Sequence, residues 1–287
     1  MRGRPLAIIT GYQRVGCPVW MPGALARWKK RNPHGRLFLF AHELPAPFPI
    51  TSHHFWFAKV NEWIMQRLAR VADVLITNSE NHVRQLRRLS GRDDVELLLV
   101  PSNIEPVADA PLHRARGEFV IWGLPFGRWQ TLQLFDAHIR RWQTDGVLTR
   151  LHISGPQEGE FVTRAEALIR EWPRPELVQR HPPLGPAASA RLLQSAGFAL
   201  TNVSAETWSK SGVFMACAAT RCPLVMEKKA DVVPLCYTIS PEEIPNIADA
   251  ELETRAAALE KWYRANADWP VTAKRMALIA EGVAHAR

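Results

Sequence analysis

Short apolar runs alternate with segments of helical periodicity along most of the chain. In the first third, four runs have the composition of buried strands: 6–10, 37–40, 73–77 and 96–100. Three segments between them are predicted to be helices: 22–31, 57–72 and 82–89. In 57–72 the apolar residues fall on one helical face, at Val60, Ile64, Leu68 and Val71. This alternation predicts an α/β fold.

The segment 101–117 interrupts the alternation. It holds Pro101, Pro106 and Pro111 and has little hydrophobic periodicity, which is typical of a linker. We therefore expect a boundary near Ala110, with a short first domain at 1–110 and a second domain at 111–287.

After this linker the alternation is more regular. Five strands are predicted, at 118–122, 148–153, 176–179, 198–201 and 223–226. Four helices are predicted between them, at 131–142, 163–172, 186–195 and 213–219, and two more in the tail, at 250–267 and 272–284. The pattern predicts a doubly wound parallel sheet, which binds its ligands at the carboxyl ends of its strands.

The stretch 198–226, FALTNVSAETWSKSGVFMACAATRCPLVM, carries the strongest chemical signal. Between its first strand and its helix lie hydroxyl groups, a carboxylate, an ammonium group and a glycine: Ser204, Glu206, Lys210, Ser211 and Gly212. The start of a helix exposes unpaired N–H groups and the positive end of a dipole, so it attracts phosphate. The alternative is an ordinary strand–helix–strand unit whose Lys210 is simply solvated.

Composition narrows the function classes. The 287 residues are 47% hydrophobic and 22% charged, which is typical of a globular protein. The sequence contains no apolar run long enough to cross a bilayer, and its start does not resemble a signal peptide, so we expect a cytoplasmic location. The four cysteines lack metal-ligand or redox spacing, which predicts free thiols and no metal site. The adjacent His53 and His54 point in different directions and do not change that expectation.

The net charge of +8 is concentrated at the N-terminus. No acidic residue precedes Glu43, whereas eight cations do: Arg2, Arg4, Arg14, Arg27, Lys29, Lys30, Arg31 and Arg36. The predicted basic helix 22–31 also holds Trp28, a pattern suited to an anionic membrane surface. A solvated helix face is the alternative. The aromatic residues show no nucleic-acid-binding signature, so no nucleic-acid partner is expected.

Several of these segments, in this order, resemble a known family. ADVLITNSE followed by a helix, VPSNI before the linker, the glycine loop WGLPFGR after a strand, LHISGP and finally 198–226 are similar to segments of GT-B glycosyltransferases. The most similar type is the retaining family 4 group. The resemblance covers about 37–226 and implies two Rossmann-type domains facing a cleft, with a nucleotide-sugar donor on the second domain and a glycan or lipid-linked acceptor on the first.

The resemblance also implies roles for individual residues, without a cofactor or metal. Gly123, Gly127 and Gly155 would let the backbone approach the donor, and Arg128 would place a cation on its diphosphate. Lys210, Ser211 and Gly212, with Glu206, would form the other side of the cradle. On the first domain, His42 and Glu43 in FAHEL would face the transferred sugar or the acceptor, and Gly11 and Gly16 would form an acceptor-side loop. For His42 the alternative is a loop histidine satisfied by backbone.

Two other functions stay open. The family commonly has two glutamates eight positions apart in this unit, but Phe214 lies eight residues after Glu206. Counting back from Pro223 instead places Ala216 at the second position, and Arg221 stands where a glycine is usual. A catalytically silent GT-B-like protein that binds a nucleotide or glycan, or supports a partner enzyme, is therefore the main alternative. A third possibility is another nucleotide enzyme, such as an epimerase or phosphotransferase. It has less support, because the sequence contains no Walker or GxGxxG motif.

Overall fold

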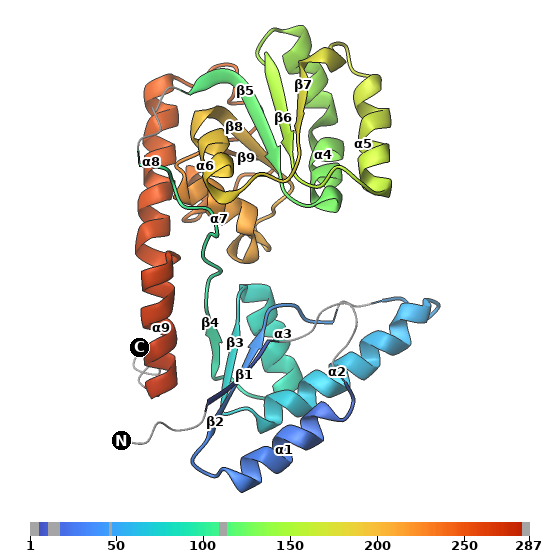
Figure 1. Ribbon diagram of the computed structural model, residues 1–287, viewed down its shortest axis with the longest axis vertical. Helices are drawn as coiled ribbons and strands as arrows, with labels where there is room; N and C mark the ends of the chain where they lie inside the picture. The colour runs from blue at the N-terminus through green and yellow to red at the C-terminus, as the bar shows by residue number, and fades with distance from the viewer. Residues whose placement is uncertain (1–5, 11–17, 46–47, 109–113, 283–287) are drawn as a thin grey trace. The chain divides into compact units, whose positions relative to one another are not determined.

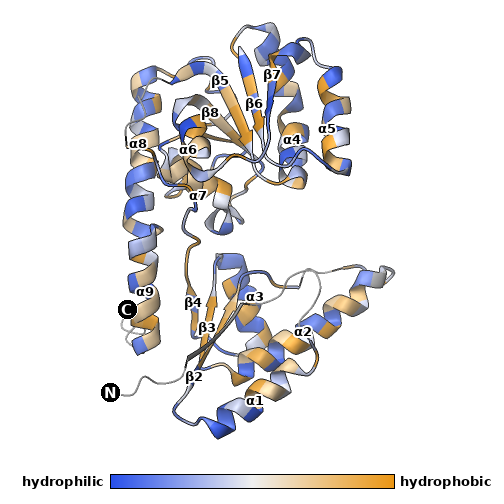
Figure 2. Ribbon diagram, in the orientation of Figure 1, coloured by the Kyte–Doolittle hydropathy of each residue, from blue (hydrophilic) through white to orange (hydrophobic). Residues whose placement is uncertain are grey.

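Helices and parallel strands alternate throughout the computed structural model, which describes residues 6–10, 18–45, 48–108 and 114–282 (Figure 1). The strands are largely apolar, whereas most helices carry both apolar and polar residues (Figure 2). Strands of that composition suit a parallel sheet covered by helices. The α/β fold predicted from the sequence is confirmed. Within the described residues, none of the helices combines the length and apolar composition that a membrane span needs.

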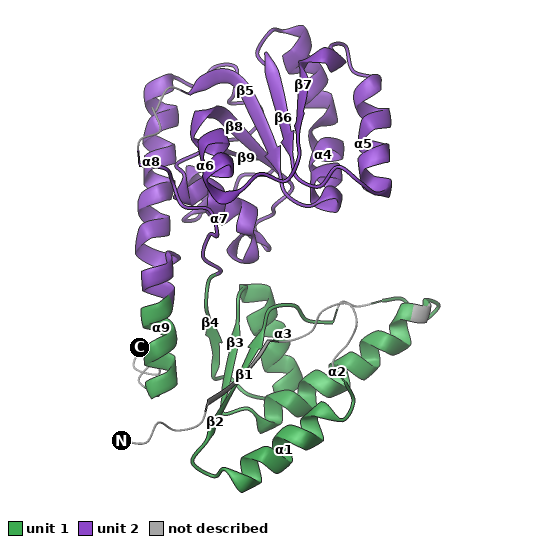
Figure 3. Ribbon diagram, viewed as in Figure 1, with its two compact units in different colours: residues 1–99, 273–287 green, residues 100–272 purple. Residues whose placement is uncertain are grey.

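The chain divides into two compact units (Figure 3). Unit 1 comprises residues 1–99 and 273–287, and unit 2 comprises residues 100–272. The expected boundary near Ala110 lies outside the described residues. The units differ from the predicted domains at the C-terminus, since residues 273–287 belong to unit 1. The reason is packing: Ile279 of helix α9 (Trp269–Glu281) lies in the same apolar cluster as Phe38 and Ile76.

Unit 1 contains a four-stranded parallel sheet with its strands in chain order. The strands are β1 (Leu6–Thr10), β2 (Arg36–Ala41), β3 (Val74–Thr77) and β4 (Val95–Leu97). The helices between them are α1 (Met21–Arg31), α2 (His53–Val71) and α3 (Glu80–Ser90). Each lies close to its predicted position, and the four strands agree with the expectation of a short first unit.

The three helices of unit 1 cover the same face of its sheet. Leu37, Leu39 and Leu75 point to that face and cluster with apolar residues of α1, α2 and α3. Alternate residues of the same strands, including Phe38 and Ile76, point to the other face. We call α1, α2 and α3 the helix layer of unit 1. Its outer surface is the side turned away from the sheet.

Unit 2 contains a five-stranded parallel sheet. The strands are β5 (Ala115–Trp122), β6 (Arg150–Ser154), β7 (Val178–His181), β8 (Ala196–Thr201) and β9 (Leu224–Met226). The helices are α4 (Pro125–Thr144), α5 (Glu160–Arg170), α6 (Pro186–Ser195), α7 (Gly212–Ala219) and α8 (Asp249–Asn266). Three short 3-10 helices are η1 (Pro175–Leu177), η2 (Trp208–Lys210) and η3 (Leu235–Tyr237).

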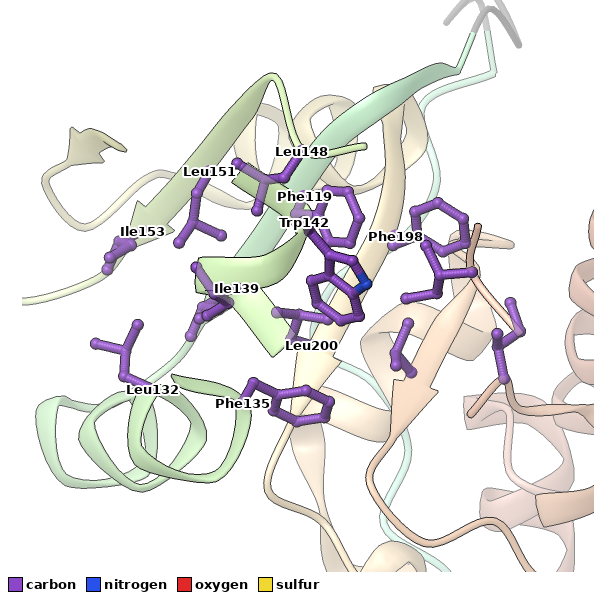
Figure 4. Packing of buried hydrophobic residues seen from close by; sticks show 14 of the residues in the cluster. Phe119, Leu132, Phe135, Ile139, Trp142, Leu148, Leu151, Ile153, Phe198 and Leu200 are labelled. Carbon is purple, nitrogen blue, oxygen red and sulfur yellow. The ribbon is translucent and has the colours of Figure 1, made fainter. Parts of the chain in front are cut away.

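The strand order β7–β6–β5–β8–β9 reverses direction between β5 and β8. This is the doubly wound arrangement, and ligands bind such sheets outside the carboxyl ends of the strands at the reversal. Below this edge lies an aromatic core, where the ring centroid of Phe119 is 5.2 Å from that of Trp142 and 5.0 Å from that of Phe198 (Figure 4). The core fixes β5 against β8 and α4, and so fixes the edge that they form.

Candidate functional site

Two glycine turns meet at the carboxyl edge of the unit 2 sheet. Gly123 follows β5 with φ +132°, and Gly155 follows β6 with φ +138°. A Cβ on Gly155 would lie 2.2 Å from the Gly123 carbonyl oxygen. Position 155 therefore requires glycine for its backbone conformation and for the close approach. That Gly123 and Gly155 let the backbone approach a donor stays a prediction.

The start of α7 adjoins these turns. A Cβ on Gly123 would lie 3.4 Å from Cγ2 of Val213, in the first turn of α7. The Ser211 hydroxyl caps the helix by accepting from the Phe214 amide at 3.2 Å. The amides of Gly212 and Val213 donate to no acceptor in the described part of the chain. We call Gly123, Gly155 and residues 211–213 the cradle. It offers backbone N–H groups and a helix dipole to an anion.

Arg128 lies behind the cradle, not on its surface. Its side chain is 3% exposed, and Nη2 donates to the Pro156 carbonyl, just after Gly155. Its Nε has no hydrogen-bond partner among the described residues, and burial lowers the pKa of the guanidinium. Arg128 and Glu166 line one small cavity, but Glu166 forms an ion pair with Arg180 at 3.6 Å. Arg128 is thus a buried cation that holds the Gly155 turn.

Aromatic packing holds η2, which directly precedes the cradle residues 211–213, in place. The Trp208 ring in η2 lies 5.5 Å from Phe214 in α7 and 5.3 Å from Trp262 in α8. The Ser209 carbonyl accepts from the Val100 amide at 3.4 Å. Phe214 is fully buried, as is Ala216, so the positions where the family commonly has a glutamate belong to the core here.

Asn202 is a site residue that our sequence reasoning missed. It follows β8 directly, where its amide donates to Gln130 at 3.0 Å and its Oδ1 accepts from Thr131 at 3.5 Å. These contacts tie the end of β8 to the first turns of α4. The signal was present in the sequence, because a polar residue directly after a buried strand lies at the ligand edge.

The other predicted residues of unit 2 lie around the cradle. Lys210 is half-buried at the end of η2, and Glu206 is exposed in the preceding loop. Gly127 lies in the first turn of α4, where a Cβ would meet no heavy atom within 4 Å. Position 127 therefore does not require glycine, in contrast to position 155. Arg221 has φ +57°, a left-handed backbone conformation that favours glycine. This conformation accounts for the glycine that GT-B glycosyltransferases usually have at the corresponding position.

In unit 1, His42 lies at the carboxyl edge of its own sheet. His42 is exposed after β2, and its Nδ1 is 2.5 Å from Nδ2 of Asn78, which follows β3. This contact orients the imidazole, so Nε2 is the ring nitrogen that is not bound to Asn78. Our sequence reasoning did not single out Asn78. Glu43 is half-buried next to His42, while Gly11 and Gly16 lie outside the described residues.

A second polar group extends from β5 to β7. His152 Nδ1 lies 2.9 Å from Nε2 of His181, and its Nε2 lies 3.2 Å from Glu118. The His181 carbonyl accepts from the Gly155 amide at 3.2 Å. These contacts anchor the outer strands beside the Gly155 turn. None of the described His, Cys, Asp and Glu side chains form a cluster of three or more that would hold a metal ion.

The stability of this protein is expected to fall as the pH drops through about 6.5, the ordinary pKa of histidine. Burial lowers the pKa of His152, and the hydrogen bond to Glu118 offsets this only in part. The unfolded chain therefore binds a proton that the folded chain does not. Replacing His152 with Gln should reduce the slope of unfolding free energy against pH by up to about 1.4 kcal/mol per unit. Urea titrations between pH 5.5 and 7.5 measure this slope, and an unchanged slope would contradict the assignment.

Solved structures with the same fold are glycosyltransferases. Anabaena HepE in complex with UDP has a TM-score of 0.69 at 12% identity, covering 96% of this chain and 78% of that one. Trehalose 6-phosphate synthase of Burkholderia multivorans has a TM-score of 0.68 at 14% identity, covering 100% and 73%. A glycosyltransferase of Rickettsia africae has a TM-score of 0.58 at 7% identity, covering 99% of both chains.

These similarities concern the fold. The neighbours share the two-domain, Rossmann-like GT-B fold, and HepE was also crystallised with UDP and glucose together. The sequence itself matches no family model and no curated protein. The GT-B fold expected from the sequence motifs is therefore supported by structure alone.

Proposed function

We propose that this protein is a glycosyltransferase that moves a sugar from a nucleoside-diphosphate sugar to a glycan or lipid-linked acceptor. The observation that carries the proposal is the cradle at the reversal between β5 and β8, where two glycine turns meet the start of α7. Its backbone N–H groups and its helix dipole suit a diphosphate. Similarity to UDP-bound glycosyltransferases supports the same function.

The proposed reaction is metal-independent and retaining. The bond between the sugar and the diphosphate breaks, and negative charge develops on the leaving nucleoside diphosphate. The first amides of α7 and the ammonium group of Lys210 stabilise that charge, while Arg128 adds a buried positive charge behind Gly155. Arg128 also positions the Gly155 turn, because its Nη2 donates a hydrogen bond to the Pro156 carbonyl.

The acceptor side is proposed to lie in unit 1. With Nδ1 hydrogen-bonded to Asn78, His42 presents Nε2 to a sugar or acceptor hydroxyl. Asn78 holds the ring in this orientation. Glu43 next to His42 is the carboxylate that we propose contacts an acceptor hydroxyl. For an acceptor linked to lipid, the protein would work in the cytoplasm, peripherally on the inner face of the membrane.

Release of nucleoside diphosphate from a panel of nucleotide sugars tests the proposal. We expect one donor to be consumed in the presence of EDTA, slowly with water and faster with lipid-linked or oligosaccharide acceptors. NMR of the product should show that the anomeric configuration of the donor is kept. Consumption that requires a divalent cation would refute metal independence, and an inverted product would refute retention.

One observation favours a second function. Phe214 and Ala216 are core residues at the positions where the family commonly has a glutamate, so a sugar-recognising carboxylate is missing from α7. A protein that binds nucleotide or glycan without transfer fits this change. Calorimetry that detects nucleotide binding, while no donor in the panel is ever consumed, would support this alternative.

A further inference from the structure

Helix α2 has a second apolar face that no described residue covers. Its first face, including Ile64, Met65 and Leu68, packs in the core of unit 1. The second face consists of Trp56, Phe57, Val60 and Trp63, which are 66%, 68%, 47% and 41% exposed. These positions recur at helical spacing, so they form one stripe. Val60, which the sequence predicted on the same face as Ile64 and Leu68, lies outside that core cluster. We call these four residues the aromatic face.

The apolar surface continues beyond the helix. Phe48 and Ile50, in the segment that leads into α2, are 40% and 70% exposed. Isolated exposed apolar side chains are normal on a protein surface, but six of them on one helix and the segment that leads into it indicate an interaction site. Two tryptophans and two phenylalanines also have the composition of a surface that meets a lipid–water interface.

Cations flank the aromatic face. The guanidinium carbon of Arg67 lies 4.5 Å from the ring centroid of Trp63, and Lys59 lies 5.7 Å from that of Phe55. Exposed cations continue on the neighbouring helices of the layer: Arg27, Lys30 and Arg31 on α1, and Arg84, Arg87 and Arg88 on α3. Within the three helices the acidic residues are Glu62, which pairs with Lys59, and Glu80.

We propose that the outer surface of the helix layer of unit 1 binds an anionic lipid bilayer, with the aromatic face of α2 inserted among the headgroups. The apolar stripe provides the buried area, and the flanking cations contact lipid phosphates. A second copy of the chain fits poorly, because it would bring two basic layers together. Of the basic N-terminal segment, this surface uses the exposed cations of α1 and adds α2 and α3. Lys29 in that segment is paired with Asp73, and Arg36 donates to the Ala280 carbonyl.

Cosedimentation of the full-length protein with vesicles tests this surface. We expect strong binding to equal parts of phosphatidylglycerol and phosphatidylcholine, weak binding to phosphatidylcholine alone, and loss of binding at high salt. The double variant Trp56→Ser with Phe57→Ser should bind at least about tenfold more weakly, since it removes two inserting side chains. The double variant Lys30→Glu with Arg31→Glu should weaken binding to anionic vesicles only.

Leu134→Ser is the matched control, because Leu134 is a 40% exposed apolar residue on α4 of unit 2. It should bind vesicles like the unaltered protein. The four substituted positions, Trp56, Phe57, Lys30 and Arg31, are exposed, so circular dichroism should show an unchanged fold. Equal vesicle binding by the Trp56/Phe57 variant would overturn the proposal. So would a change from dimer to monomer in that variant without lipid. Nucleotide-sugar turnover is measured separately and does not enter this result.

Discussion

Replacing Lys210 with Ala is expected to lower sugar transfer by about 10²- to 10³-fold while leaving the fold intact. Lys210 ends η2, directly before the Ser211 cap and the first amides of α7. A cation at this position stabilises the charge that develops on the leaving diphosphate more than the charge of the bound donor. The loss should therefore appear mainly in kcat.

Lys261→Ala is the matched control for this variant. Lys261 is exposed on α8 and is not one of the cradle residues. Its replacement removes the same charge from unit 2 and should leave transfer unchanged. If the two variants had equal activity, Lys210 would have no special role, and the ordinary strand–helix–strand interpretation of this unit would stand.

The largest expected effect on stability comes from Gly155→Ala. The added Cβ would lie 2.2 Å from the Gly123 carbonyl oxygen, a backbone atom that cannot move away cheaply, and φ is +138°. Strain of this kind and overpacking together should cost about 3 kcal/mol or more. Urea denaturation measures that loss, and the cradle should lose nucleotide binding even where the variant stays folded.

Gly127→Ala adds the same methyl group at a position with no heavy atom within 4 Å of the new Cβ. Because Gly127 is in the first turn of α4, alanine there should leave stability unchanged or raise it by up to about 1 kcal/mol. Equal destabilisation by the two variants would show that the Gly155 turn has no special backbone requirement.

The order of elements could be predicted from the sequence because most strands contain a short apolar run, although β7 (VQRH) does not. β8 is buried along its whole length, and the apolar run 198–201 marks most of it. The start of α7 was also predictable, since Ser211 and Gly212 directly precede the apolar run 213–219. Local patterns of this kind carry over directly into strands, helix starts and their caps.

Contacts between distant segments could not be predicted. The sequence does not indicate that the Arg128 side chain, in α4, donates to the Pro156 carbonyl. That contact depends on how the start of α4 lies against the segment after β6. The pairing of His42 with Asn78 depends on the β2–β3 register. Likewise, α9 packs on unit 1 through Ile279, although its sequence follows directly on unit 2.

The central claim is that the carboxyl edge of the unit 2 sheet binds a nucleoside diphosphate. Calorimetric titration of UDP, the nucleotide bound by HepE, into the unaltered protein, Lys210→Ala and Lys261→Ala tests it most directly. We predict saturable one-site binding, without added metal, to the unaltered protein and Lys261→Ala, and binding at least about tenfold weaker to Lys210→Ala. Equal UDP affinity in all three proteins, or no binding of UDP or any other nucleoside diphosphate, would contradict the account.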